Sequence, residues 1–163
     1  MALFRRSRPD DPDLAALVGR RRVLASGSSA EGPVLGLADA LVHPGAGGWH
    51  EVSWHEIEHG GWDHASRTLR WTRTDGGTGS VVLTDTGHLP DLFNERVTAS
   101  IACVRTVDLD GTGQAVITAR RDLGNPDGPL VWRVAPGKGV QPGQVDADPR
   151  VALELARLRA EYA

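Results

Sequence analysis

The chain has 163 residues, a charged fraction of 24% and a formal net charge of -3 at pH 7. This size allows one domain with a hydrophobic core, and the charge balance indicates neither a nucleic-acid partner nor an acidic membrane surface. Cys103 is the only cysteine, which excludes an internal disulfide and a thiolate zinc cage. The apolar runs are far shorter than the roughly 20 residues of a membrane span, and no apolar segment follows the charged start. We therefore expect a cytoplasmic protein without a membrane span.

Residues 1–22 are predicted to form an N-terminal arm that contains one short helix. Asp11 is suited to cap this helix, and Pro12 is suited to its first position. The apolar stripe of the helix would consist of Leu14, Leu17 and Val18. The three arginines at 20–22 are typical of a solvated entry into a strand, with a phosphate-binding patch as the alternative.

The next part of the chain has the pattern of short strands separated by glycine-rich turns. A strand begins at Val23, a turn is expected at residues 27–32, and a nearly continuous apolar run predicts one central strand over 34–42. Residues 44–48 have the composition of a loop. Further hairpin turns are predicted at residues 63–66, 75–77 and 110–113.

Two stretches have the period of an amphipathic helix. Apolar residues recur every four positions from Leu89 onward, and Pro90 suits a first helical turn, which predicts a helix over 90–102. A second capping signal at Asp148 precedes a predicted C-terminal helix over 149–162. The apolar face of that helix consists of Val151, Leu155, Leu158 and Tyr162. Residues 136–143, which come before it, are predicted to be a loop.

Together these elements predict a mainly β (α+β) fold of about eight short strands with a C-terminal capping helix. The segment Leu37-Ala38-Asp39-Ala40-Leu41-Val42, followed by Trp54-His55-Glu56-Ile57 and Trp62-Asp63, resembles bacterial PH-like and GRAM-type domains, as in small proteins of high-GC bacteria. The resemblance implies one domain over residues 23–163, built as a small barrel or as two curved antiparallel sheets. The helix over 90–102 would be an insertion into that plan.

The segment from Trp49 to Trp71 holds four of the five tryptophans and four of the six histidines. Within it, His55-Glu56-Ile57-Glu58-His59 matches a zinc-protease motif, in which two histidines on one helical face bind the metal and the glutamate is the general base. Here the segment enters as a strand and two glycines follow it, whereas the motif needs a helix. On a strand His55 and His59 would stand about 13 Å apart, too far for one zinc ion.

We therefore expect the motif to be structural, with Trp54 and Ile57 facing the core and the polar side chains between them facing outward. The predicted function is a non-enzymatic interaction domain without a cofactor. Its expected partner is a protein or a peptide rather than a lipid headgroup, and it could form homo-oligomers. The alternative hypothesis is a small zinc-dependent hydrolase that uses His55, His59 and Glu56.

Three further patterns bear on function. Cys103 is expected to be a small buried side chain rather than a nucleophile, because no histidine or other base flanks it. The tryptophans are expected to pack in the core and at its rim, with a base-stacking or ligand groove as the alternative. Basic residues between 96 and 121 alternate with acidic ones, so no nucleic-acid-binding stripe is predicted.

Overall fold

The computed structural model describes residues 11–163, which divide into two compact units. The N-terminal unit ends at Thr98, and the C-terminal unit comprises Ala99–Ala163. The sequence led us to expect one domain over 23–163. In the structure, the residues of each unit pack mainly against other residues of the same unit. The first ten residues of the predicted arm lie outside the described part of the chain.

Residues 11–163 are mainly β with four α-helices, so the predicted α+β class is confirmed. Within the described residues ten strands form three antiparallel sheets, and none of these closes into a barrel. We expected about eight strands. Part of the difference arises because the chain reverses direction at Ala38 and Asp39, where the apolar pattern continues without a break.

The first sheet of the N-terminal unit has four strands in sequential order. These are β1 (Val23–Ser29), β2 (Gly32–Leu37), β3 (Ala40–Gly45) and β4 (Gly48–Ser53). The prediction of one strand over 34–42 was wrong, because the chain turns at Ala38 and Asp39. As a result β2 and β3 pair antiparallel, with Leu35 opposite Val42. The turn predicted at 27–32 is shorter than expected, because β1 continues to Ser29 and β2 begins at Gly32.

Asp39 explains why this turn forms inside an apolar run. Its carbonyl oxygen accepts a hydrogen bond from the backbone N–H of Trp54 at 3.1 Å. Its carboxylate lies 3.1 Å from the guanidinium of Arg21, which also bonds Glu51 at 2.7 Å. Arg21 is therefore paired, whereas we expected all three arginines at 20–22 to be solvated.

The second sheet has the order β5-β6-β7. Its strands are β5 (Ile57–Asp63), β6 (Thr68–Arg73) and β7 (Thr78–Val82), and the short 3-10 helix η1 (Trp54–Glu56) precedes them. Both predicted hairpin turns are confirmed. The Asp63 carboxylate accepts the backbone N–H of Ala65 at 3.0 Å, and the Asp75 carboxylate accepts that of Gly77 at 2.9 Å. Such short aspartate bonds to the following backbone favour tight turns.

Helix α1 (Pro12–Val18) forms where the capping signal predicted it. The Asp11 carboxylate accepts hydrogen bonds from two first-turn N–H groups, including that of Leu14 at 3.2 Å. Leu14 and Val18 are buried together with residues of the first sheet, namely Leu35, Leu37 and Val42.

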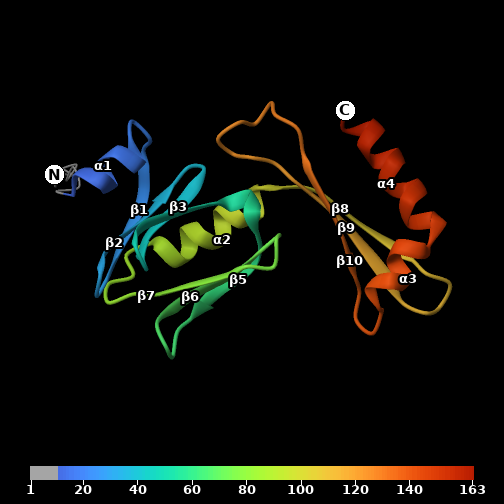
Figure 1. Ribbon diagram of the computed structural model, residues 1–163, viewed down its shortest axis with the longest axis horizontal. Coiled ribbons are helices and arrows are strands. Elements are labelled where there is room, and N and C mark those ends of the chain that lie inside the picture. The colour runs from blue at the N-terminus through green and yellow to red at the C-terminus, as the bar shows by residue number, and fades with distance from the viewer. Residues whose placement is uncertain (1–10) are drawn as a thin grey trace. The chain divides into compact units, whose positions relative to one another are not determined.

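Helix α2 (Leu89–Ala99) lies between the strands of the two sheets (Figure 1). Phe93 on this helix packs edge-on against Trp54, with ring centroids 5.7 Å apart, and lies 6.3 Å from Trp71. The predicted helix over 90–102 therefore exists but ends earlier, because the next strand already begins at Ile101.

The C-terminal unit contains a three-stranded sheet of order β10-β9-β8 and two helices (Figure 1). Its elements are β8 (Ile101–Asp108), β9 (Gln114–Arg120), β10 (Val131–Pro136), α3 (Pro142–Ala147) and α4 (Pro149–Glu161). Helix α3 was not predicted, because six residues are too few for a helical period to be visible in the sequence. Part of it occupies the loop that we expected over 136–143.

The packing of α4 confirms that the C-terminal helix belongs to a core. Leu158 is fully buried with Cys103, Ile117 and Ala119, and Val151 is buried in a second cluster. Cys103 is 8% exposed, as expected of a small buried side chain. None of the helices in residues 11–163 has the length and apolar content needed to span a bilayer.

Candidate functional site

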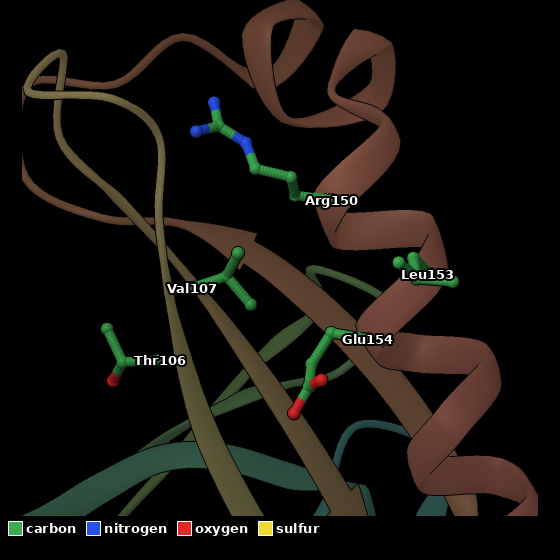
Figure 2. A pocket seen from close by; sticks show the side chains of 5 residues that line it. All are labelled: Thr106, Val107, Arg150, Leu153 and Glu154. Atoms are coloured by element: carbon green, nitrogen blue, oxygen red, sulfur yellow. The ribbon is translucent and has the colours of Figure 1, made fainter.

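A cleft of about 280 Å³ lies between β8 and α4 in the C-terminal unit. It is lined by Thr106 and Val107 of the strand and by Arg150, Leu153 and Glu154 of the helix. Figure 2 shows Arg150 and Glu154 reaching from α4 toward the strand, and Val107 pointing into the space between them. The cleft is open to solvent and combines apolar surface with two opposite charges.

The strand that borders this cleft is at the edge of its sheet. In the order β10-β9-β8, β8 pairs with β9 alone, and no other strand within residues 11–163 pairs with it. With eight residues it is also the longest strand in the described part of the chain. A long unpaired edge exposes a row of backbone donors and acceptors that another strand can bind.

The register shows which backbone groups of β8 face outward. The N–H of Leu109 donates to the carbonyl of Gly113 at 2.9 Å, which fixes one hydrogen-bonded pair at the turn. In an antiparallel pair such positions alternate, so Val107 and Arg105, which lie opposite Ala115 and Ile117, direct their N–H and C=O groups toward β9. The residues between them direct theirs away from β9. This outer edge of β8 consists of Val104, Thr106 and Asp108.

Glu154 is held by two arginines. Its carboxylate lies 2.8 Å from the guanidinium of Arg157 and 3.4 Å from that of Arg105 on β8. The hydrogen bond from Arg157, assisted by the charge of Arg105, holds the pKa of Glu154 below its ordinary value. This carboxylate is therefore ionised at neutral pH and connects the helix to the strand.

Arg150 forms the corresponding cationic end of the cleft. Its guanidinium bonds the capping carboxylate of Asp148 at 2.7 Å and also pairs with Asp110 in the β8–β9 turn. The hydrogen bonds from Arg150 lower the pKa of Asp148. The charges that border the cleft are thus fixed and paired, which suits recognition of a ligand better than proton transfer at neutral pH.

Exposed apolar side chains also occur on β8 and on α4. The described residues include eight large hydrophobic side chains that are exposed, and three of these lie on β8 or on α4. Leu153 is 74% exposed, Val104 is 57% exposed and Ile101 is 37% exposed. Exposed apolar surface rimmed by polar groups is typical of protein interaction sites.

The predicted zinc motif lies elsewhere, in the N-terminal unit, and does not form an α-helix. His55 and Glu56 belong to η1, and His59 belongs to β5. The Glu56 carboxylate accepts the backbone N–H of Ser53 at 3.0 Å and pairs with Arg73 at 3.3 Å. Within residues 11–163 no group of three or more histidine, cysteine, aspartate or glutamate side chains is arranged to hold a metal ion.

The apolar half of that prediction is confirmed. Trp54 and Ile57 are fully buried, and the indole N–H of Trp54 donates to the carbonyl of Leu37 at 2.9 Å. The prediction that the polar side chains of this segment face outward is confirmed only in part. The side chain of His59 is 77% exposed, as expected, but that of Glu58 is only 15% exposed.

A second polar cluster in the N-terminal unit was not predicted from the sequence. His43 and His50 lie opposite each other on β3 and β4, with stacked rings 5.7 Å apart, and Trp71 lies edge-on to His43 at 5.1 Å. Burial lowers the pKa of His43, and the charge of His50 lowers it further. The two histidines lie on either side of the predicted loop at 44–48, three residues before Ala46 and three after Gly47, and this equal spacing is the signal that could have paired them.

The residues of the β8–α4 cleft were also not singled out as a site. One signal was present in the sequence, because Leu153 is an apolar residue that does not belong to the buried stripe of its helix. The chain matches no family model, no curated protein and no solved structure. The interpretation of the cleft therefore depends on its own geometry.

Proposed function

We propose that this chain is a non-enzymatic interaction domain that binds an extended segment of a protein partner along the outer edge of β8. The observation that carries the proposal is the unpaired row of backbone groups on Val104, Thr106 and Asp108, beside a cleft of about 280 Å³. In recognition by strand addition, main-chain hydrogen bonds supply affinity and pockets for alternate side chains supply specificity.

The cleft supplies the second part of that mechanism. Successive side chains of an added strand point to opposite faces of the sheet, so every second side chain of the partner lies on the face that α4 covers. On that face it meets Val107, Leu153 and the paired charges of Arg150 and Glu154. We expect the preferred partner segment to place an apolar side chain there, flanked by residues that can hydrogen-bond.

A peptide-display selection on the immobilised full chain tests the proposal. Peptides enriched by the chain should bind less well, by tenfold or more, to the variant Thr106→Pro. Because the Thr106 N–H points away from β9, proline at this position removes a donor of the outer edge and no bond of the sheet. Leu153→Glu should weaken the same peptides by charging the apolar wall of the cleft.

A matched control is offered by the other edge of the same sheet. Val131 on β10 is 43% exposed, so Val131→Glu adds the same charge at a distant exposed position. This variant should bind the selected peptides as the unchanged chain does. Peptides that bind all variants equally, or a selection that enriches no peptide at a chain concentration low enough to keep the protein monomeric, would contradict the proposal.

For the N-terminal unit we propose a PH-like fold. The sequence resemblance implied such a domain over residues 23–163 with the helix over 90–102 as an insertion, whereas in this proposal α2 is the closing helix of the unit. This fold is supported by a four-stranded sheet β1–β4, a three-stranded sheet β5–β7 and the helix α2 after them, in that chain order. An experimental structure of the protein tests this. The two sheets should pack face to face with α2 closing one end, and any other packing of the sheets would exclude the fold.

A further inference from the structure

We infer that the strand added to β8 is β8 of a second copy of this chain, in an antiparallel two-fold arrangement centred on Thr106. This inference rests on the proposed function, since it names the partner of the same edge. It makes the C-terminal unit the dimerisation element of the protein, with one six-stranded sheet shared by two copies.

The first argument is that the outer edge from Val104 to Asp108 lacks two of the usual protections of a monomer. Edge strands that stay single in solution are commonly shortened, carry lysine or proline, or contain β-bulges and inward-pointing charges. β8 has eight residues and contains neither lysine nor proline, whereas β10 at the other edge has six and ends at Pro136.

The irregular pairing of β8 lies before this edge, between Ile101 and Cys103, and the inward charge of Arg105 is paired with Glu154. An unpaired strand edge of this kind can pair with other chains unless it is covered. A second copy of the chain is the partner that is always present at equal concentration.

The second argument is charge. Two copies that associate through the same surface bring identical charges together, so a strongly charged surface opposes association. The ionised side chains of β8 and the cleft are Arg105, Asp108, Arg150 and Glu154, two cations and two anions. Arg105 and Glu154 are already paired with each other, and Arg150 with Asp148 and Asp110. The surface is therefore close to neutral and self-association meets little repulsion.

The third argument is the register. A two-fold axis normal to the sheet keeps each residue on its own face, so the outward-directed residues Val104, Thr106 and Asp108 must pair with one another. An axis at Thr106 pairs it with its own copy and pairs Val104 with Asp108. This gives about six hydrogen bonds, two for each such pair, and a threonine–threonine contact of the kind that stabilises antiparallel sheets.

Two of the alternative registers are less favourable. An axis at Arg105 would place the two arginines directly opposite each other, and like charges at opposed positions destabilise a sheet. An axis at Val104 would draw the irregular pairing between Ile101 and Cys103 into the new interface. With the axis at Thr106, both copies of α4 lie on the same face of the shared sheet, and Leu153 of each copy borders the new strand pair.

Analytical ultracentrifugation of the full chain, over micromolar to hundred-micromolar concentrations, tests the association. We expect a species of about twice the chain mass of 17.4 kDa. Thr106→Pro and Leu153→Glu should each raise the dissociation constant at least tenfold, and Val131→Glu should not change it. Circular dichroism melting checks that each variant is folded, and Leu153→Glu remains informative if the proline variant is not.

Disulfide cross-linking tests the register. With Cys103 replaced by serine, Arg105→Cys and Val107→Cys chains should cross-link to each other on oxidation, because these positions oppose one another across the axis in the closely spaced kind of pair. Val107→Cys alone should cross-link poorly. Cross-linking of Val107→Cys that equals that of the mixture would overturn the register.

The result that overturns the inference is a monomer at all concentrations, or a dimer that neither Thr106→Pro nor Leu153→Glu weakens. These outcomes are separate from failure of the proposed function. A monomeric chain that still selects peptides through Thr106 and Leu153 retains the interaction edge and loses the second copy as its partner. A dimer that both variants disrupt supports both proposals.

Discussion

His43 is the residue at which we expect acid to act on the N-terminal unit. Burial and the neighbouring His50 lower its pKa from the ordinary value of 6.5. The unfolded chain then binds a proton more readily than the folded one, so the stability that neutral His43 contributes is complete above about pH 6.5 and is lost as the pH falls through the lowered pKa. The melting temperature should therefore fall as the pH is lowered below about 6.5.

The variant His43→Gln should flatten this fall in melting temperature, because it removes the group that titrates. Differential scanning calorimetry at a series of pH values measures the slope. His64 is exposed in the β5–β6 turn, so His64→Gln serves as the control and should keep the original slope. If His43→Gln shows the same slope as the unchanged chain, the acid response arises elsewhere.

The two adjacent glycines of β5 make a matched pair for a packing test. A Cβ atom at Gly60 would lie 2.6 Å from the Phe93 ring and 2.9 Å from the carbonyl oxygen of Arg70, whereas one at Gly61 would meet nothing within 4 Å. Gly60→Ala should therefore cost about 1–3 kcal/mol of unfolding free energy, and Gly61→Ala should change it by about 0.5 kcal/mol or less. Urea denaturation measures both. Equal effects would mean that α2 does not pack closely on β5.

Residues 54–59 include one buried and one exposed side chain whose substitutions can be compared. Trp54→Ala should cost about 3–5 kcal/mol, because Trp54 is fully buried and its loss also removes the indole N–H that donates to the carbonyl of Leu37. His59→Ala, at a side chain that is 77% exposed, should stay within about 0.5 kcal/mol. A large loss of stability in the histidine variant would show that His59 has a structural role that its exposure does not suggest.

At the scale of elements, α4 offers three leucines in three environments. Leu158 is fully buried, Leu155 is partly buried and Leu153 is 74% exposed. Replacement by alanine should cost about 2–5 kcal/mol at Leu158, less at Leu155 and about 0.5 kcal/mol or less at Leu153. Chemical denaturation at a protein concentration low enough to keep the chain monomeric gives the comparison. A different order would mean that α4 is rotated about its axis.

Elements with a local chemical signal could be predicted from the sequence. The capping aspartates Asp11 and Asp148, each followed by proline, located two helices, and Asp63 and Asp75 located two hairpin turns. The turn at Asp39 could not be predicted, because it is held by Arg21 and by the backbone of Trp54, which are distant in the sequence. Its neighbours on both sides are apolar, so the local pattern indicated a continuous strand.

The candidate site could not be predicted for a related reason. The period of a strand indicates which side chains share a face. It contains no information on whether a strand lies at the centre or the edge of its sheet. That property of β8 depends on the order of all the strands in the unit. Leu153 carried a weak signal of exposure, and Thr106 carried none.

At the scale of the whole molecule, the division into two units predicts that their stabilities can be altered one at a time. The buried clusters around Leu158 and Val151 contain only residues of the C-terminal unit, and the cluster around Leu14 contains only residues of the N-terminal unit. Local opening free energies follow such packing boundaries. Leu158→Ala should therefore speed amide hydrogen exchange in β8, β9 and β10 and leave β2 and β3 almost unchanged.

Trp54→Ala should produce the reverse pattern, because its side chain packs against Phe93 of α2 and bonds the end of β2. Hydrogen exchange followed by mass spectrometry resolves both variants on the same set of peptides, so each serves as the control for the other. If either substitution accelerated exchange equally in all three sheets, the two units would unfold together. The cores would then be coupled despite their separate packing, and a variant that weakens the β8 edge would have to be checked for loss of structure in the N-terminal unit as well.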